Sequence, residues 1–247
     1  MRRLFKKITK NTRSIEDGIF FEKITKILGF EPKELRHYKK AFTHRSTNKI
    51  DDKGNPFNYE RLEFLGDAML GSVIAAHLYN EVPSGDEGYL TKMRSKIVSR
   101  DHLNELGRDF NLVGFVESKV NSNQFGENIH GNLFEAFIGA IYLDRGFEYC
   151  EKFIRTKIIK KYVDIDKLEG KVISYKSLII EWCQKEKISF AFDFVNDNGI
   201  EEQKYFGVKL ALDHKIIARA RATSKKKAEE KASQRAYFAL QEKISQK

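Results

Sequence analysis

Three acidic residues, Glu60, Glu63 and Asp67, follow one another at spacings of three and four. On a helix these side chains share one face, where like charges repel by a few tenths of a kcal/mol per pair. The apolar neighbours Leu62 and Leu65 draw part of this face toward a core. Carboxylates held together in this way suit a hard divalent cation such as Mg²⁺ or Mn²⁺. The alternative is a solvated acidic stripe, with Glu60 stabilising the helix N-terminus.

A second stretch, Gly131–Leu143, is apolar almost throughout and carries Asn132 and Glu135 as its polar residues. A helix that is apolar on all sides is buried, and an unpaired buried carboxylate is costly. Glu135 therefore needs a partner. That partner is either a metal ion shared with Glu63 and Asp67 or an arginine or lysine in a buried salt bridge.

Near the C-terminus, Ser224 is followed by Lys225, Lys226 and Lys227. Ser224 is a suitable N-cap for a helix, yet three lysines in a first turn are unfavourable because a helix N-terminus is itself positive. A phosphate bound at the helix start would relieve this conflict. The alternative is a solvated lysine run without a ligand.

The elements that must position these residues change in kind along the chain. From residue 15 to residue 163, apolar residues recur every three or four positions, as in amphipathic helices. Polar segments interrupt this pattern at Asp51–Pro56, Pro83–Gly88 and Asn121–Gly131. No convincing alternation of strand type occurs in this block, so we predict an all-α domain over residues 15–163.

A different pattern follows a short linker, which we place at residues 164–172. A helix with Tyr175 and Ile179 on one stripe comes first, and the last helix begins near Ser224. Between them, strands are expected at Phe190–Val195, Phe206–Leu212 and Lys215–Ala222, with turns at Asn196–Gly199 and Asp213–His214. Residues 173–243 are therefore predicted to form a small α+β domain of order α-β-β-β-α.

Charge is distributed unevenly along this chain of net charge +10. Residues 1–13 carry six Lys and Arg and no acid. Residues 14–170 carry 23 basic and 25 acidic side chains, a net charge of −2, whereas residues 171–247 carry 16 and 10, a net charge of +6. Basic ends suit a polyanion and an acidic block suits a metal site. Ordinary surface charge is the alternative.

Two cysteines, Cys150 and Cys183, are too few for a disulfide framework or a cysteine-type zinc site. No apolar run reaches the ~18 residues that a membrane span requires. The basic N-terminus lacks the apolar segment of a secretory signal. We expect a cytoplasmic protein with no membrane partner.

The acidic motifs together resemble those of the ribonuclease III family. Tyr59–Ala68 is similar to the family's signature almost residue for residue. Pro83–Gly88 is similar to the acidic loop that follows it, and Asn132–Asp144 to the helix that supplies further ligands. Residues 173–243 resemble the double-stranded-RNA-binding domain, so the resemblance covers nearly the whole chain.

The resemblance implies roles for individual residues. It implies metal ligands at Glu63, Asp67, Asn132 and Glu135, and catalytic residues at Asp67, Glu135, Glu60 and Glu87. Mg²⁺ is the implied cofactor, with Mn²⁺ as a possible substitute. Glu60 and Glu87 are implied to be outer residues that shape the site and its phosphate contacts, and Phe64 to insert into the partner subunit of a homodimer.

Asn132 departs from the family pattern, which usually has Asp at this position. Its carbonyl oxygen can still coordinate a metal, but it brings no negative charge, so the cation is held less tightly. The alternative is that Asn132 donates a hydrogen bond to Glu63 or Glu135 and holds these ligands in place.

For the second domain, the resemblance implies RNA-binding residues at Ser177, Glu181, Lys225, Lys226 and Lys227. Two positions depart from the family pattern. Ile180 stands where Gln is common, and Glu202 stands where the loop between the first two strands often carries His. Both changes indicate a weaker or altered grip on the minor groove of the RNA.

The implied function is that of a Mg²⁺-dependent endonuclease that cuts double-stranded RNA by metal-assisted hydrolysis. It is expected to leave 5′-phosphate and 3′-hydroxyl ends and to process ribosomal and messenger RNA precursors. The rival is a catalytically weak RNA-binding or scaffolding protein derived from such enzymes. Asn132 favours this rival, and the retained carboxylates argue against it. A DNA-binding protein is disfavoured by the type of the second domain.

Overall fold

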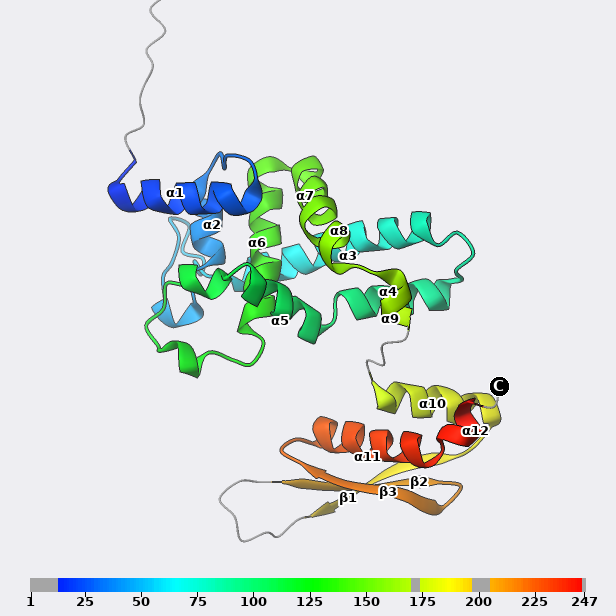
Figure 1. The fold of residues 1–247 in the computed structure, drawn as a ribbon. Helices are drawn as coiled ribbons and strands as arrows, with labels where there is room; N and C mark the ends of the chain where they lie inside the picture. Colours follow the sequence, from blue (N-terminus) through cyan, green and yellow to red (C-terminus); the bar gives the residue numbers. More distant parts are fainter. Residues whose placement is uncertain (1–12, 170–173, 197–204, 246–247) are drawn as a thin grey trace, which may run out of the picture. The chain divides into compact units, whose positions relative to one another are not determined.

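The structure is a computed structural model that describes residues 13–169, 174–196 and 205–245. The chain divides into two compact units, residues 1–171 and 172–247. The first unit is helical, and the second contains a three-stranded sheet (Figure 1). The predicted fold class, an all-α domain followed by a small α+β domain, is confirmed.

Helices and loops build the first unit. Its α-helices are α1 (Ile15–Leu28), α2 (Leu35–Ala41), α3 (Glu60–Glu81), α4 (Glu87–Ile97), α5 (Arg100–Asp109), α6 (Ile129–Arg145), α7 (Phe147–Phe153), α8 (Lys160–Tyr162) and α9 (Ile165–Glu169). Short helical segments of other types are η1 (Arg45–Thr47), η2 (Leu112–Phe115), η3 (Ser122–Gln124) and η4 (Ile154–Ile159). Helix α6 begins at Ile129, slightly before the predicted start at Gly131.

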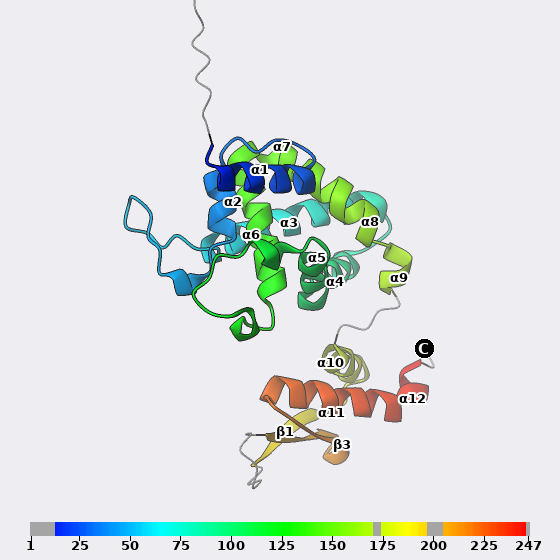
Figure 2. The same ribbon diagram turned by 60° about the vertical axis from the view of Figure 1, so that its left-hand side comes forward.

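Helix α6 forms the centre of the helical unit. Its side chains Leu133, Phe134, Phe137 and Ile138 are fully buried, as expected for a helix that is apolar on all sides. Helices α2, α3, α5 and α7 pack against it, and Figures 1 and 2 show it running among them. Each such side chain contributes roughly 1.5–3 kcal/mol on burial, so this helix holds its neighbours in place.

Two glycines allow α3 and α6 to cross with their backbones in contact. A Cβ atom at Gly66 would lie 1.7 Å from the carbonyl oxygen of Glu135, and one at Gly139 would lie 2.3 Å from that of Leu62. Any larger residue at either position would push the two helices apart. The crossing therefore brings the acidic turns of α3 next to α6.

Helix α5 approaches α6 in the same way. A Cβ atom at Gly107 would lie 2.1 Å from the carbonyl oxygen of His130, and one at Gly131 would lie 3.1 Å from Cβ of Leu103. This contact places Arg100, the first residue of α5, beside the first turns of α6.

Part of the segment expected as a linker is helical. Helix α9 packs against α4 and buries Leu168. Nζ of Lys96, a residue that is 5% exposed, donates to the carbonyl oxygens of Leu168 (2.7 Å) and Glu169 (3.0 Å). The local pattern does not reveal this helix, because the lysine that caps its C-terminus lies far away in α4. Residues 170–173 lie outside the described part of the chain.

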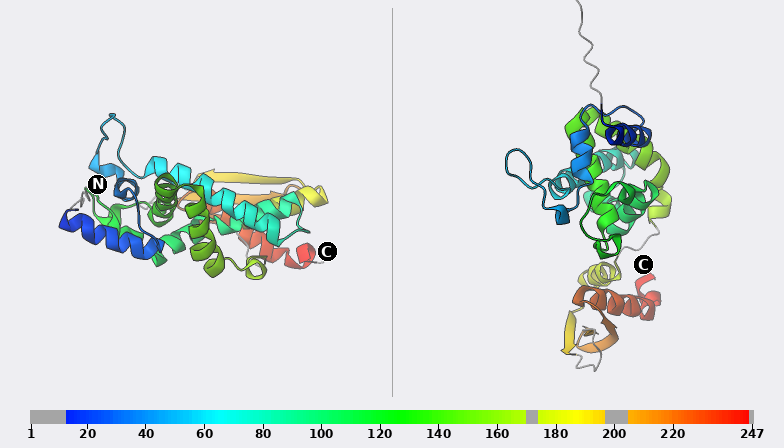
Figure 3. Two further views of the ribbon diagram at one scale, coloured as in Figure 1. Left: turned by 90° about the horizontal axis from the view of Figure 1, so that it is seen from above. Right: turned by 90° about the vertical axis from the view of Figure 1, so that its left-hand side faces the viewer.

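The second unit has the predicted α-β-β-β-α order and one further short helix. Its elements are α10 (Tyr175–Glu186), β1 (Phe190–Asn196), β2 (Phe206–Leu212), β3 (Lys215–Ala222), α11 (Lys225–Ala239) and α12 (Gln241–Ser245). The sheet is antiparallel in the order β1-β2-β3. Helices α10 and α11 lie on one side of this sheet in the right-hand view of Figure 3.

A stripe of alanines brings α11 close to the sheet. Ala228, Ala232 and Ala236, at the spacing of four noted in the sequence, are all fully buried. The predicted turn at Asp213–His214 joins β2 to β3 with positive φ angles of 43° and 65°. The expected turn beyond Asn196 and the loop residue Glu202 lie outside the described residues.

We predict that Gly66→Ala destabilises the helical unit by about 3 kcal/mol, since the added methyl group overlaps the backbone of α6. Gly71→Ala is the matched control on the same helix, because nothing lies within 4 Å of a Cβ atom there. This control should gain up to about 1 kcal/mol from helix propensity. Urea unfolding of both variants measures the difference. Equal stabilities would mean that α3 and α6 are not in backbone contact.

Candidate active site

The acidic residues of α3 and α6 face a hollow of about 520 Å³ beside the crossing of these helices. The lining residues come from the first turns of α3, from α6 and from the α4–α5 junction: Glu60, Glu63, Phe64, Asp67, Val98, Arg100, Leu103 and Glu135. The hollow thus combines four carboxylates, one guanidinium and three apolar side chains. Four of the acidic residues singled out in the sequence are brought together here.

Glu135 is the most buried of these carboxylates, with 4% of its surface exposed. Burial, and then the negative charges of Asp67 and Glu63, raise its pKa from an ordinary 4.5 to about 7, while Arg100 opposes this shift. Burial is also the main cause of the raised pKa of Glu63. The cluster thus holds more negative charge than its surroundings compensate, which favours the binding of a cation.

Glu60 and Glu87, the two expected outer residues, occupy different places. Glu60 opens α3, and its Oε1 lies 3.6 Å from Nη1 of Arg45. Glu87 opens α4 and accepts a hydrogen bond from the hydroxyl of Thr91 (3.1 Å). Helix α4 reaches the hollow at its opposite end, through Val98. Within one chain, the structure therefore does not bring Glu87 to the other carboxylates.

Asn132 lies beside the cluster, where its side chain meets Arg100. Its Oδ1 accepts a hydrogen bond from Nη1 of Arg100 (3.0 Å). The pKa of Tyr59 is raised mainly by burial, and Asn132 opposes this shift. These partners differ from Glu63 and Glu135, which the sequence offered as alternatives.

Arg100 is a residue of this site that the sequence reasoning missed. Its Nη1 lies 4.0 Å from Oε2 of Glu135. The sequence offered a buried salt bridge as one alternative for Glu135, whereas the side chain of Arg100 is 59% exposed. Its sequence signal is weak, because it lies 32 positions from Asn132. The local sequence gives one indication. Arg100 directly follows the N-cap Ser99, and a cation at the start of a helix opposes the helix dipole.

The side chains of the hollow fit a hard divalent cation in their chemistry. Within the described ranges, no group of three or more His, Cys, Asp or Glu is closed around a point that could hold a metal ion. The donors are nevertheless the carboxylate oxygens that Mg²⁺ prefers. The buried carboxylate of Glu135 keeps a raised pKa, which shows that the positive charge near it is too small to stabilise its anion fully. A cation would supply that charge.

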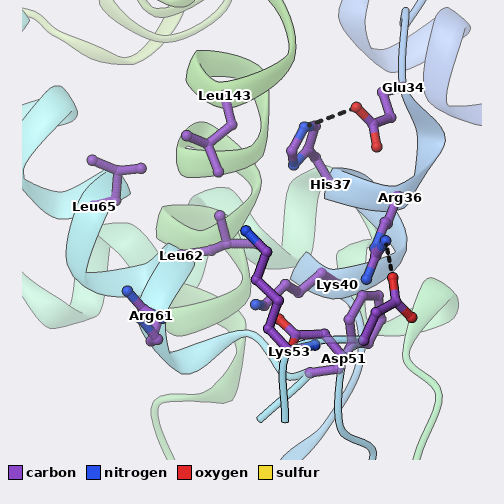
Figure 4. Close-up of a pocket in the computed structure, with 12 residues that line it drawn as sticks. Glu34, Arg36, His37, Lys40, Asp51, Lys53, Arg61, Leu62, Leu65 and Leu143 are labelled. Carbon is purple, nitrogen blue, oxygen red and sulfur yellow. Dashed lines mark hydrogen bonds and ion pairs between the residues drawn. The ribbon is translucent and has the colours of Figure 1, made fainter. Parts of the chain in front are cut away.

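Phe64 is 80% exposed although it is a large apolar side chain. A second hollow of about 480 Å³ lies between α2, the loop before α3, the start of α3 and the end of α6 (Figure 4). Figure 4 shows Leu62, Leu65 and Leu143 on the α3 and α6 side of this hollow and charged side chains of α2 and the loop opposite them. The second hollow thus presents apolar side chains next to charged ones, and Leu65 of this hollow directly follows Phe64 on α3.

The lysine run opens α11, and Ser224 is the N-cap of that helix as predicted. The Ser224 hydroxyl accepts a hydrogen bond from the backbone N–H of Lys227 (3.2 Å). Lys225, Lys226 and Lys227 are exposed, and Nζ of Lys225 lies 5.0 Å from the ring centre of Phe194. This helix start concentrates positive charge in the way that phosphate binding requires.

A glutamate of α11 fixes the start of α10. The Glu230 carboxylate accepts hydrogen bonds from the backbone N–H of Tyr175 (2.6 Å) and from the hydroxyl of Ser174 (2.8 Å). Ser177 and Glu181 are exposed on α10, as the expected contact with RNA requires, whereas the nearby Ile180 is partly buried.

Two protein-family models match the two units separately. Residues 34–162 match the model described as Ribonuclease-III-like, and residues 175–240 match the double-stranded RNA binding motif. Among the described residues, the helices fall short of the length and apolar character that a membrane span needs.

Relatives match nearly the full length of the chain. Ribonuclease 3 of Flavobacterium psychrophilum is 71% identical over 98% of this chain and 98% of the relative. Ribonuclease 3 of Zunongwangia profunda is 66% identical over 95% and 97% of the two chains. The solved nuclease domain of ribonuclease III from Campylobacter jejuni is 32% identical with a TM-score of 0.50, and the match covers 57% of this chain and 98% of that one.

A helical unit with clustered carboxylates, joined to a double-stranded-RNA-binding unit, defines a nuclease that acts on double-stranded RNA. The chain belongs to the ribonuclease III family and is an endoribonuclease of that type.

Proposed function

We propose that the hollow lined by Glu63, Asp67 and Glu135 is the active site, at which the protein hydrolyses double-stranded RNA with Mg²⁺, or with Mn²⁺ in its place. The observation that carries this proposal is the burial of Glu135 beside two other carboxylates. A buried carboxylate is costly as an anion unless a cation joins it. Hydrolysis at this site leaves 5′-phosphate and 3′-hydroxyl ends.

The side chains at the hollow have different proposed roles. Glu63, Asp67 and Glu135 hold the cation, with the carbonyl oxygen of Asn132 as a neutral fourth ligand. When bound, the cation makes a water molecule more acidic and neutralises charge at the phosphate. Asp67 and Glu135 act as catalytic residues by orienting these reacting groups.

Two further carboxylates act outside this set of ligands. Glu60 stands at the rim of the hollow, and Glu87 begins α4 at a distance from it. We propose that both shape the electrostatic field along the path of the RNA, where they direct its phosphates toward the site.

We propose that the protein is a homodimer in which Phe64 inserts into the partner subunit. The exposure of Phe64 supports this proposal, because burial of its large apolar side chain against a partner subunit is favourable. The hollow in Figure 4 offers further apolar side chains beside charged ones, a combination that occurs at interfaces. The solved nuclease domain from Campylobacter jejuni likewise has a region involved in dimer formation.

In the second unit, Lys225, Lys226 and Lys227 bind phosphates, while Ser177 and Glu181 face the minor groove of the RNA. We propose precursors of ribosomal and messenger RNA as substrates, and the cytoplasm as the compartment. The two cysteines are free and buried, which suits a reducing compartment.

Glu135→Gln should abolish cleavage and leave RNA binding nearly unchanged, because the amide keeps the shape of the carboxylate but brings no charge to the cation. The expected loss in single-turnover cleavage of double-stranded RNA with Mg²⁺ is about 100-fold or more, which corresponds to about 3 kcal/mol of transition-state stabilisation. Gel-shift titration measures binding. A variant that cleaves at close to the wild-type rate would place the active site elsewhere.

The same substitution should stabilise the metal-free protein at alkaline pH. Because the folded-state pKa of Glu135 is raised from 4.5 to about 7, the wild type loses stability as the pH rises through this range, and the penalty is fully present above it. In a chelator, the variant should melt a few degrees above the wild type at pH 8, and this difference should vanish below pH 4.5. Glu22→Gln, an exposed change in α1, should show no difference. A pH-independent difference would contradict this explanation.

Replacing Lys225, Lys226 and Lys227 together by Ala should weaken RNA binding and flatten its salt dependence. Each lost phosphate contact lowers the slope of log affinity against log salt by about 0.7–0.9, so three contacts remove about 2. The control replaces Lys152, Lys160 and Lys161, which are exposed in the helical unit. An unchanged slope in the first variant would show that these three lysines do not contact phosphates.

Phe64→Asp should dissociate the dimer, because a charge at the centre of an apolar interface is left without a partner. Sedimentation should give about twice 28.7 kDa for the wild type and a single chain mass for the variant. Phe238→Asp makes the same change at an exposed position of the second unit and should leave the dimer intact. A monomeric wild type at micromolar concentration would rule out the homodimer.

A further inference from the structure

The acidic hollow has a cation of its own among its lining residues, the guanidinium of Arg100. This group donates a hydrogen bond from Nη1 to Oδ1 of Asn132 (3.0 Å) and lies 4.0 Å from Oε2 of Glu135. The side chain of Glu135 is 6% exposed and that of Arg100 is 59% exposed. Arg100 therefore reaches from solvent onto a carboxylate that solvent itself hardly touches.

The position of Arg100 is set by backbone packing. Because Gly107 and Gly131 carry no side chains, α5 packs closely against α6. Ser99 precedes Arg100 as the N-cap residue of α5. A cation in the first turn of a helix opposes the helix dipole, so the nearby carboxylates are what make this place favourable for an arginine.

Arg100 and a divalent cation would compete for the same carboxylate. Two cations that approach Glu135 together repel each other, and this repulsion is stronger at a partly buried site than in water. The guanidinium must then withdraw from Glu135, but it need not leave the hollow. It has five N–H donors in a planar fork, which suits a phosphate as well as a carboxylate.

We propose that Arg100 is a second functional cation of the active site, which offsets part of the charge of Glu135 before a divalent cation binds and contacts an oxygen of the RNA phosphate afterwards. This inference rests on the proposed function of the hollow. It also gives Asn132 a physical role. A neutral amide keeps the guanidinium beside the site, whereas an aspartate there would hold it in a charge-assisted pair that opposes its transfer to RNA.

The test compares the full-length wild type with Arg100→Ala, Arg100→Lys and the control Arg108→Ala, which removes an exposed arginine from the other end of the same helix. Calorimetric titration with Mn²⁺ in the absence of RNA gives the metal affinity. Single-turnover cleavage of double-stranded RNA at saturating Mn²⁺ gives the contribution to the reaction. Melting temperatures with Mn²⁺ check that each variant is folded.

Arg100→Ala should bind Mn²⁺ roughly three- to tenfold more tightly than the wild type, because it removes a competitor, yet cleave about tenfold more slowly. Arg100→Lys should keep near wild-type Mn²⁺ affinity and cleave at an intermediate rate, because lysine retains the charge but lacks the planar fork. Arg108→Ala should change neither quantity. An unchanged Mn²⁺ affinity or an unchanged cleavage rate in Arg100→Ala overturns the proposal. A wild type that neither binds Mn²⁺ nor cleaves RNA refutes the proposed function itself.

Discussion

The backbone contact between α3 and α6 is the constraint on which the rest of the helical unit depends. Burial of the apolar side chains of α6 drives its neighbours together, and Gly66 and Gly139 let α3 approach until backbone meets backbone. Gly66 stands between Glu63 and Asp67 on α3, and its partner across the contact is the backbone of Glu135. The packing of the core and the convergence of the acidic groups are therefore consequences of one contact.

Convergence of the carboxylates opposes folding in the absence of a cation. The hydrophobic free energy of the core outweighs this cost. The pKa values of Glu135 and Glu63 are raised first by their burial and further by the neighbouring carboxylates. Arg100, at the start of α5, offsets part of this negative charge. A ligand that binds the folded state and not the unfolded state adds its binding free energy to stability, so occupancy of this hollow couples to the stability of the helical unit.

In the second unit, positive charges instead of negative ones are gathered in an unfavourable arrangement. Its lysines gather at the N-terminus of α11, where the helix dipole already contributes positive charge. Ser224 caps this helix, and Glu230 ties it to the start of α10, so that the unfavourable charges keep a defined position. In both units, a charge arrangement that is unfavourable in the free protein suits the ligand that we propose for it: a cation in the hollow, and RNA phosphate at α11.

The sequence by itself determined those features that repeat over a few residues. Spacings of three and four residues placed Glu60, Glu63 and Asp67 on one helix face, alternation located the three strands, and the Ser-Lys run located the start of α11, because side-chain direction follows the local backbone period. Only the tertiary structure decided which distant residues meet. Arg100 reaches Asn132 from 32 positions away, Glu87 lies apart from the hollow at the other end of α4, and α9 is capped by Lys96. The physical reason is that these contacts depend on where whole helices cross, which is set by the glycines and apolar surfaces of several elements together and leaves no periodic signal near the residues concerned.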